Sequence, residues 1–164
     1  MNQLLHVSAS PHIKDRVTTS SIMLDVIIAL IPATLFGIIQ FKINALLIIV
    51  TTITTCVLAE YLYERFMKKT ITIKDLSAVV TGLILALNLP STVPLWLPVI
   101  GGLFAIIVVK QFYGGLGQNF MNPALAARCF LLISFTGRMT NFVFDGMTSS
   151  TPLAILKNGE SFDL

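Results

Sequence analysis

The stretch SIMLDVIIALIPATLFGIIQF at residues 21–41 and the stretch INALLIIVTTITTCVLAEYLY at residues 43–63 decide the fold class of this chain. Asp25 and Pro32 are the only interruptions of the first stretch, and Glu60 lies near the end of the second. A helix of about 20 residues spans the ~30 Å hydrocarbon core of a bilayer. The two stretches therefore predict two full-length transmembrane helices, separated by Lys42.

Three further apolar blocks follow at residues 76–90, 93–109 and 123–135. The first of them has only fifteen residues, and a helix of that length is about 22 Å long. Either the true helix extends beyond the apolar block, or short segments form discontinuous helices that line an internal site. We predict an all-α, polytopic membrane protein with about five transmembrane segments, of which the third and fifth are short or broken.

The composition of the whole chain agrees with this prediction. Of 164 residues, 55% are hydrophobic and 12% are charged, and the mean hydropathy is +0.85. A soluble domain carries about a quarter charged residues, and a disordered chain is poor in apolar ones, so both classes are excluded. Residues 1–20 lack the apolar core of a signal peptide. We expect a cytoplasmic arm at 1–20, a membrane domain at 21–136 and an extracytoplasmic loop at 137–164.

The basic residues predict the orientation, because cytoplasmic loops carry an excess of Lys and Arg. Seven of the eleven basic residues fall on the side of the N-terminus, and three fall on the opposite side. The first group is Lys14, Arg16, Arg65, Lys68, Lys69, Lys74 and Lys110, and the second is Lys42, Arg138 and Lys157. The N-terminus is therefore expected in the cytoplasm. The net charge of +3 then follows the topology, and nucleic acid is not an expected partner.

Three charged residues lie within the apolar blocks, where burial of a charge is costly. Asp25 and Glu60 fall near the predicted cytoplasmic ends of the first and second segments. Each is either a station for a proton or a cation, or an interfacial residue that is solvated or paired with a basic neighbour. Arg128 falls deeper, within the fifth segment, and predicts a buried partner or an anionic ligand.

The cysteines and histidines predict no metal site. Cys56 and Cys129 stand singly in apolar runs, where a buried cysteine behaves as a small hydrophobic residue. His6 and His12 lie in the polar N-terminal arm, at a spacing that matches no metal motif. Two cysteines also exclude a four-cysteine metal site and a scaffold of several disulfides.

The glycine-rich stretch GGLG at residues 114–117 connects the fourth and fifth segments. It is not a phosphate-binding loop of the usual kind, because no strand precedes it and no Lys-Ser or Lys-Thr pair follows it. Its glycines allow tight turning of the backbone, and Pro123 after Asn122 suits the first position of a helix. A polar connection of this kind is also suited to binding the polar edge of a cofactor.

A run of hydroxyl residues occupies the stretch DGMTSSTPLA at residues 145–154. From physical chemistry alone, this is an exposed loop in which a hydroxyl caps a helix that starts at Pro152. A threonine hydroxyl is not acidic, so it would need an external catalyst to become a phosphoester.

The chain resembles the D subunit of the Rnf electron-transport complex, a membrane protein similar to the B subunit of the sodium-pumping NADH:quinone reductase. The stretches that carry the resemblance run in order through most of the chain. They are SPH at 10–12, MLDVIIALIPA at 23–33, DLSAVVTGL at 75–83, LNLP at 87–90, KQFYGGLGQN at 110–119, MNPA at 121–124 and the hydroxyl-rich stretch at 145–154. Each stretch is a weak signal alone, whereas the ordered series is specific.

The resemblance implies a covalent flavin. In that family the threonine that ends the hydroxyl motif carries FMN as a phosphoester, attached by a flavin transferase that uses FAD as donor. The matching residue is Thr151, which follows Ser150 where the family pattern often has alanine. The implied site lies on the outer side of the membrane. Its other expected residues are Asp145, Thr148, Ser149 and Ser150, which would shape the loop, and Arg128, which would lie near the flavin.

The resemblance also implies a function. An Rnf-type complex of the inner (plasma) membrane couples electron transfer between ferredoxin and NAD to the movement of sodium ions or protons. The chain would be a redox subunit of this oxidoreductase, incomplete on its own, whose partners are the other Rnf subunits, a flavin transferase, the lipid bilayer and the coupling ion. Family members continue with further membrane helices after the flavin site, so the chain is expected to be an N-terminal part.

Two other functions fit the same residues. In a small-solute channel or transporter, polar residues at membrane depth would line a path, and Thr151 would be an ordinary helix cap. The path residues would be Asp25, Asn88, Asn119 and Arg128. A structural remnant without flavin would bind neighbouring subunits only.

Overall fold

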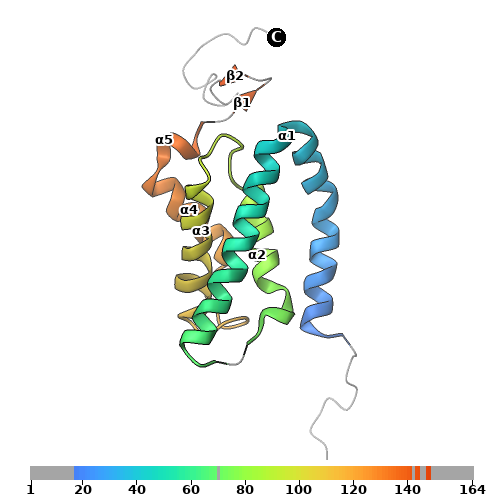
Figure 1. The fold of residues 1–164 in the computed structure, drawn as a ribbon, viewed down its shortest axis with the longest axis vertical. Helices are drawn as coiled ribbons and strands as arrows, with labels where there is room; N and C mark the ends of the chain where they lie inside the picture. The colour runs from blue at the N-terminus through green and yellow to red at the C-terminus, as the bar shows by residue number, and fades with distance from the viewer. Residues whose placement is uncertain (1–16, 70, 142, 145–146, 149–164) are drawn as a thin grey trace, which may run out of the picture.

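The computed structural model describes residues 17–69, 71–141, 143–144 and 147–148. In this part of the chain, helices pack side by side into a bundle, and a two-stranded hairpin lies at one end (Figure 1). The elements in chain order are α1 (Thr19–Phe66), η1 (Ile73–Asp75), α2 (Ser77–Leu87), α3 (Trp96–Leu103), η2 (Phe104–Gln111), α4 (Pro123–Ser134), α5 (Thr136–Met139), β1 (Val143–Phe144) and β2 (Met147–Thr148). The predicted all-α fold class is confirmed.

The longest element, α1, consists of two antiparallel arms. Lys42 interrupts the helix with a φ of 54° and a ψ of −135°, and the chain reverses there, so that residues 19–41 and 43–66 form a helical hairpin (Figure 1). Each arm is about 35 Å long, which is enough to span the hydrocarbon core. Within the described residues, α1 is the one helix long and apolar enough to cross a membrane. It supplies both of the full-length segments that the sequence predicts.

The third and fifth segments are short, as predicted. α2 has 11 residues and α4 has 12 residues, so each is about 17 Å long. α3 continues without interruption into η2, whose hydrogen bonds have the wider π-helical spacing. The predicted start of α4 is also confirmed, because the Asn122 side chain accepts hydrogen bonds from the backbone of Ala124 and Leu125, and Pro123 occupies the first turn.

The core lies where the second arm of α1 packs against α2 and α3. Gly82 of α2 sits directly on this arm, since a Cβ added to it would lie 2.8 Å from the Cα of Ile53. The largest apolar cluster fills the space between these helices and α4, and its members include Ile48, Leu83, Leu97 and Leu131. The first arm, in contrast, leaves most of its large apolar side chains exposed, which is typical of a surface that lipid or protein covers.

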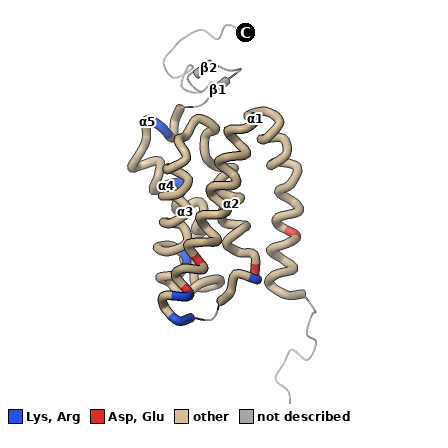
Figure 2. The backbone as a smooth tube through the Cα atoms, in the orientation of Figure 1, with Lys and Arg blue, Asp and Glu red and all other residues tan. Residues whose placement is uncertain are grey.

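Most charged residues that the structure describes lie toward one end of the bundle (Figure 2). Figure 2 shows Lys and Arg gathered at the end of the molecule where the chain passes from α1 to α2, while the opposite end holds the Lys42 turn, α5 and the β1–β2 hairpin. One basic residue does not lie where the predicted topology places it. Lys110 was expected in a cytoplasmic loop, but it lies in η2 with its side chain only 2% exposed. Without Lys110 the bias between the two sides is still six to three.

Candidate functional site

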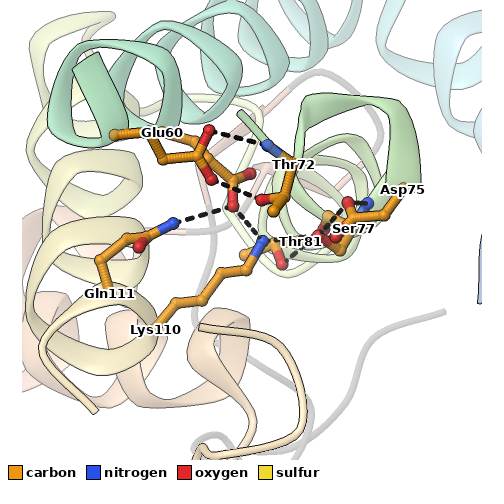
Figure 3. Close-up of polar contacts among 8 residues, drawn as sticks. Glu60, Thr72, Asp75, Ser77, Thr81, Lys110 and Gln111 are labelled. Carbon is orange, nitrogen blue, oxygen red and sulfur yellow. Dashed lines mark hydrogen bonds and ion pairs between the residues drawn. The ribbon is translucent and has the colours of Figure 1, made fainter. Parts of the chain in front are cut away.

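The most unusual feature of the interior is a buried ion pair between the second arm of α1 and η2. The Lys110 Nζ lies 2.6 Å from Oε1 of Glu60, and neither side chain is more than 2% exposed. Figure 3 shows the two side chains pointing toward each other from these two elements. The two residues meet because Glu60 lies near the end of the second arm and Lys110 near the end of η2, and both elements end at the same side of the bundle (Figure 1).

A second contact ties Lys110 to α2. Its Nζ donates to Oγ of Ser77 at 2.5 Å, and this hydroxyl donates in turn to Oδ1 of Asp75 at 2.6 Å. The same carboxylate oxygen accepts from the Ser77 backbone N–H at 2.9 Å, which holds the start of α2. The result is a continuous polar chain, visible in Figure 3, from buried Glu60 through Lys110 and Ser77 to the half-buried Asp75.

Glu60 is only partly satisfied. Its Oε1 accepts from Lys110 and also from Nε2 of Gln111, at 3.0 Å. Its Oε2 is buried and has no hydrogen-bond partner within the described residues. A buried carboxylate oxygen without a donor is costly. Glu60 therefore has an acceptor free to take a proton or a cation.

Glu64, one turn further along α1, has a different role. Its carboxylate is 2% exposed and accepts hydrogen bonds from the backbone N–H of Thr72, at 3.0 Å, and from the Thr72 hydroxyl. These contacts fasten the chain before η1 to the end of α1. Glu64 thus stabilises the connection between α1 and η1, whereas Glu60 forms the ion pair with Lys110.

A cavity of about 350 Å³ adjoins the ion pair. Its lining includes Lys110, Ser77 and Thr81 on one side and Gly117 and Asn119 of the glycine-rich connection on another. The glycines of this connection turn the backbone as predicted, with φ of +113°, +99° and +85° at Gly114, Gly115 and Gly117. Lys110 and Ser77 therefore border a cavity whose lining combines polar residues with a larger apolar part.

The arrangement is suited to moving charge. Removing two charges from water costs several kcal/mol per ion, so a buried pair persists only with good geometry and added hydrogen bonds. Lys110 has such hydrogen bonds, to Glu60 and Ser77, and the Oε2 of Glu60 has no hydrogen-bond partner within the described residues. A proton that neutralised Glu60, or a cation that replaced the ammonium group beside it, would release Lys110 toward Ser77 and the cavity.

Of the three charges that the sequence analysis singled out within the apolar blocks, only Glu60 belongs to the buried ion pair. Asp25 is exposed on the first arm of α1. Glu60 is paired with a basic residue, which agrees with the second of the two expectations for it. It is, however, buried and not exposed to solvent at an interface. Arg128 is exposed on α4, and its Nη1 donates to Oδ1 of Asn88 at 3.0 Å. The solute-path residues are therefore only partly together, with Asn88 and Arg128 in contact and Asn119 at the cavity.

The two cysteines differ. Cys56 is fully buried in an apolar cluster with Ala59, Ala78 and Ile106, as expected of a small hydrophobic residue. Cys129 is exposed, so the prediction of burial is wrong for it. The reason is the helical phase of α4, whose buried face runs through Ala124, Ala127 and Leu131.

Most of the predicted flavin loop lies outside the described residues. This holds for Asp145, Ser149, Ser150 and Thr151, and also for His6 and His12 in the N-terminal arm. The backbone of Thr148 is described, and it pairs with Val143 across the antiparallel β1–β2 hairpin. The run of hydroxyl residues therefore starts on a hairpin at the end of the bundle opposite the basic residues (Figure 1).

Sequence reasoning missed Lys110, Ser77 and Gln111 as parts of a site. The position of Lys110 near Glu60 could have been predicted, because the second and fourth predicted segments end on the same side of the membrane. Glu60 and Lys110 therefore had to lie at similar depth, with opposite charges near apolar surroundings. No comparable signal marks Ser77 or Gln111, whose roles depend on packing.

Comparison with known proteins matches the chain to one family. The model of the NQR2, RnfD, RnfE family matches residues 6–164. A relative from Acetobacterium woodii, the D subunit of a Na(+)-translocating ferredoxin:NAD(+) oxidoreductase complex, is 50% identical over 98% of this chain and 52% of its own length. The D subunit of the proton-translocating ferredoxin:NAD(+) oxidoreductase complex of Clostridium ljungdahlii is 42% identical over 92% of this chain and 47% of its own length. The D subunit of the ion-translocating oxidoreductase complex of Shewanella denitrificans is 42% identical over 84% of this chain and 40% of its own length. The chain thus spans about half the length of these relatives.

Proposed function

Because the chain belongs to the NQR2, RnfD, RnfE family, we propose that it acts as a membrane redox subunit of an ion-translocating ferredoxin:NAD oxidoreductase. The observation that carries the proposal is the match over nearly the whole chain to the D subunits of such complexes. Its partners would be the other subunits of the complex and the lipid bilayer. The charge distribution supports an orientation with the α1–α2 connection in the cytoplasm and the hairpin end outside.

The proposed cofactor is FMN, held by a phosphoester at Thr151. The support is the sequence motif at 145–154, together with a hairpin register that holds Thr148 at the end of the bundle. A flavin transferase would form the bond between the Thr151 Oγ and phosphorus, break the phosphoanhydride of FAD and release AMP. Asp145, Thr148, Ser149 and Ser150 would shape the loop for the transferase. Once bound, FMN supplies electron transfer, and the protein holds and orients it.

Flavin attachment is tested by expressing the chain with a flavin transferase and viewing a denaturing gel under ultraviolet light. We expect a fluorescent band for the unchanged chain and for Ser150→Ala, and a dark band for Thr151→Val. Intact mass should show one FMN, less one water, in the fluorescent samples only. A fluorescent Thr151→Val band would contradict the assignment of Thr151. Solute flux into vesicles by the chain without flavin would instead favour the channel.

We further propose that the Glu60–Lys110 pair takes part in ion movement. The support is its burial, the unpartnered Glu60 Oε2 and the adjoining cavity. The names of the relatives mention sodium ions in one case and protons in another, so family membership does not select the ion. A buried carboxylate with one unpartnered oxygen suits either ion, because it can be neutralised by a proton or can bind a cation.

The test compares two buried glutamates in the assembled complex, reconstituted into vesicles and driven by reduced ferredoxin. We expect Glu60→Gln to lower ion uptake per electron passed to NAD. The matched control is Glu64→Gln, which removes a carboxylate one turn away that holds Thr72 and does not touch Lys110. Equal ion uptake per electron in the Glu60 variant and the unchanged complex would refute the proposal.

A further inference from the structure

The outward face of α4 carries one stripe of exposed side chains at the i, i+3, i+4, i+7 spacing of a helix surface that packs on another element. The members of this α4 stripe are Leu125, Arg128, Cys129 and Leu132. Leu125 is 47% exposed and Leu132 is 39% exposed. The opposite face of α4 is already packed in the bundle, so the stripe is a second and unoccupied packing surface within the described structure.

A groove runs beside the α4 stripe. It has a volume of about 450 Å³ and lies between α4 and η2. Phe104 and Val108 line one wall, Leu125 and Cys129 line the other, and Phe120 lies in the connection between them. The lining is almost entirely apolar, so it matches the aliphatic side chains of a helix better than it matches a phosphate, which needs several hydrogen-bond donors.

Arg128 places a charge in the middle of the α4 stripe, next to Cys129, which lines the groove. It lies about 8 Å from either end of α4, and the hydrogen bond that the structure gives it goes to the neutral amide oxygen of Asn88. Within the described residues the one ion pair is Glu60–Lys110, so Arg128 has no carboxylate partner there. A guanidinium group that faces hydrocarbon at this depth is costly, and intramembrane arginines instead pair with acidic groups inside protein.

We propose that the α4 stripe and its groove dock a transmembrane helix that presents an aspartate or glutamate to Arg128. The apolar lining of the groove is the reason for proposing a helix with aliphatic side chains. The absence of a carboxylate partner for Arg128 in the described residues is the reason for proposing an acidic side chain on that helix. Arg128 can bind a carboxylate through two parallel hydrogen bonds, a geometry that also fixes the register of the docked helix. The inference needs only the contacts around α4 and holds whether or not Thr151 carries flavin.

The test uses the assembled complex in native membranes. A photoreactive benzoylphenylalanine replaces Leu132 of the α4 stripe, and a matched control carries it at Phe36, which is 69% exposed on the first arm of α1. We expect the probe at Leu132 to crosslink to a peptide from an apolar helix that contains an Asp or Glu. Crosslinks only to lipid, or only to a segment without an acidic residue, would overturn the proposal.

Charge reversal then tests the pairing itself. We expect Arg128→Glu to lower the crosslink yield about tenfold or more, because one partner of a buried charge pair is then repelled, and Arg128→Lys to retain most of it. Replacing the acidic residue found in the crosslinked peptide by Arg should restore the yield in the Arg128→Glu background. Absence of that restoration would overturn the pairing. An unchanged crosslink in Arg128→Gln with loss of covalent flavin would overturn it too and assign Arg128 to the cofactor.

Discussion

At the scale of single residues, the decisive feature is a pair of opposite charges that lie fifty positions apart in the sequence. Glu60 and Lys110 are both buried, and each charge would be unfavourable there alone. The pair is stable because Ser77 and Gln111 add hydrogen bonds to it. The energetic consequence is an asymmetry: loss of one partner leaves an uncompensated buried charge, whereas loss of both does not.

This asymmetry gives a stability prediction. We expect Lys110→Met to lower the free energy of unfolding by about 3 kcal/mol, since it leaves the Glu60 carboxylate buried without its counter-ion. The double variant Lys110→Met with Glu60→Gln should recover most of that loss. Unfolding in detergent, followed by the accessibility of buried Cys56 to a thiol reagent, measures the change. Additive losses in the double variant would mean that the two charges do not stabilise each other.

At the scale of elements, close helix contacts hold the polar chain from Glu60 to Asp75 in place. Gly82 lets α2 approach the second arm of α1 so closely that an added Cβ would meet the backbone of Ile53 and Thr52. A Cβ added to Gly102 of α3 would likewise lie against the side chains of Thr55 and Cys56 of the same arm. Small residues at such positions are typical of packed membrane helices. These contacts bring Ser77 at the start of α2 within reach of Lys110.

A substitution at Gly82 tests this packing. A Cβ at this position would lie 2.8 Å from the Ile53 Cα, a backbone atom that cannot move aside as a side chain does. We expect Gly82→Ala to destabilise the bundle by about 1–3 kcal/mol. Gly37→Ala is the control, because nothing lies within 4 Å of its added Cβ and alanine favours a helix over glycine. Thermal unfolding of both variants in detergent makes the comparison, and equal midpoints would contradict the close contact.

At the scale of the whole molecule, the two ends of the bundle differ in charge. Basic residues gather around the α1–α2 connection, and the Lys42 turn, α5 and the hairpin occupy the other end (Figure 2). The buried ion pair and its cavity lie toward the basic end, whereas the hydroxyl run begins at the hairpin. The proposed ion site and the proposed flavin site therefore belong to opposite ends of one subunit.

The orientation of these ends is testable with single cysteines. In a Cys129→Ser background, which removes the exposed native thiol, we expect Lys42→Cys to react with a membrane-impermeant maleimide in intact cells. Lys68→Cys should react only after the cells are permeabilised, because the positive-inside rule places that connection in the cytoplasm. The reverse pattern of labelling would invert the proposed topology.

Features that depend on local pattern could be predicted from the amino-acid sequence. Two runs of 21 residues with few charges were enough to predict the arms of α1, and Asn122-Pro123 was enough to predict the start of α4, because length, hydropathy and capping act over a few neighbouring residues. The family resemblance likewise came from ordered local motifs.

Contacts between residues far apart in the sequence became known from the packing of the helices. Lys110 lies in η2 and not in the predicted loop, and Cys129 is exposed and not buried, because these positions depend on where η2 ends and on which face of α4 is packed. The partners of Glu60, the cavity beside it and the exposed stripe around Arg128 arise from contacts between helices. Such contacts follow from the packing of whole elements, which periodicity within one segment does not specify.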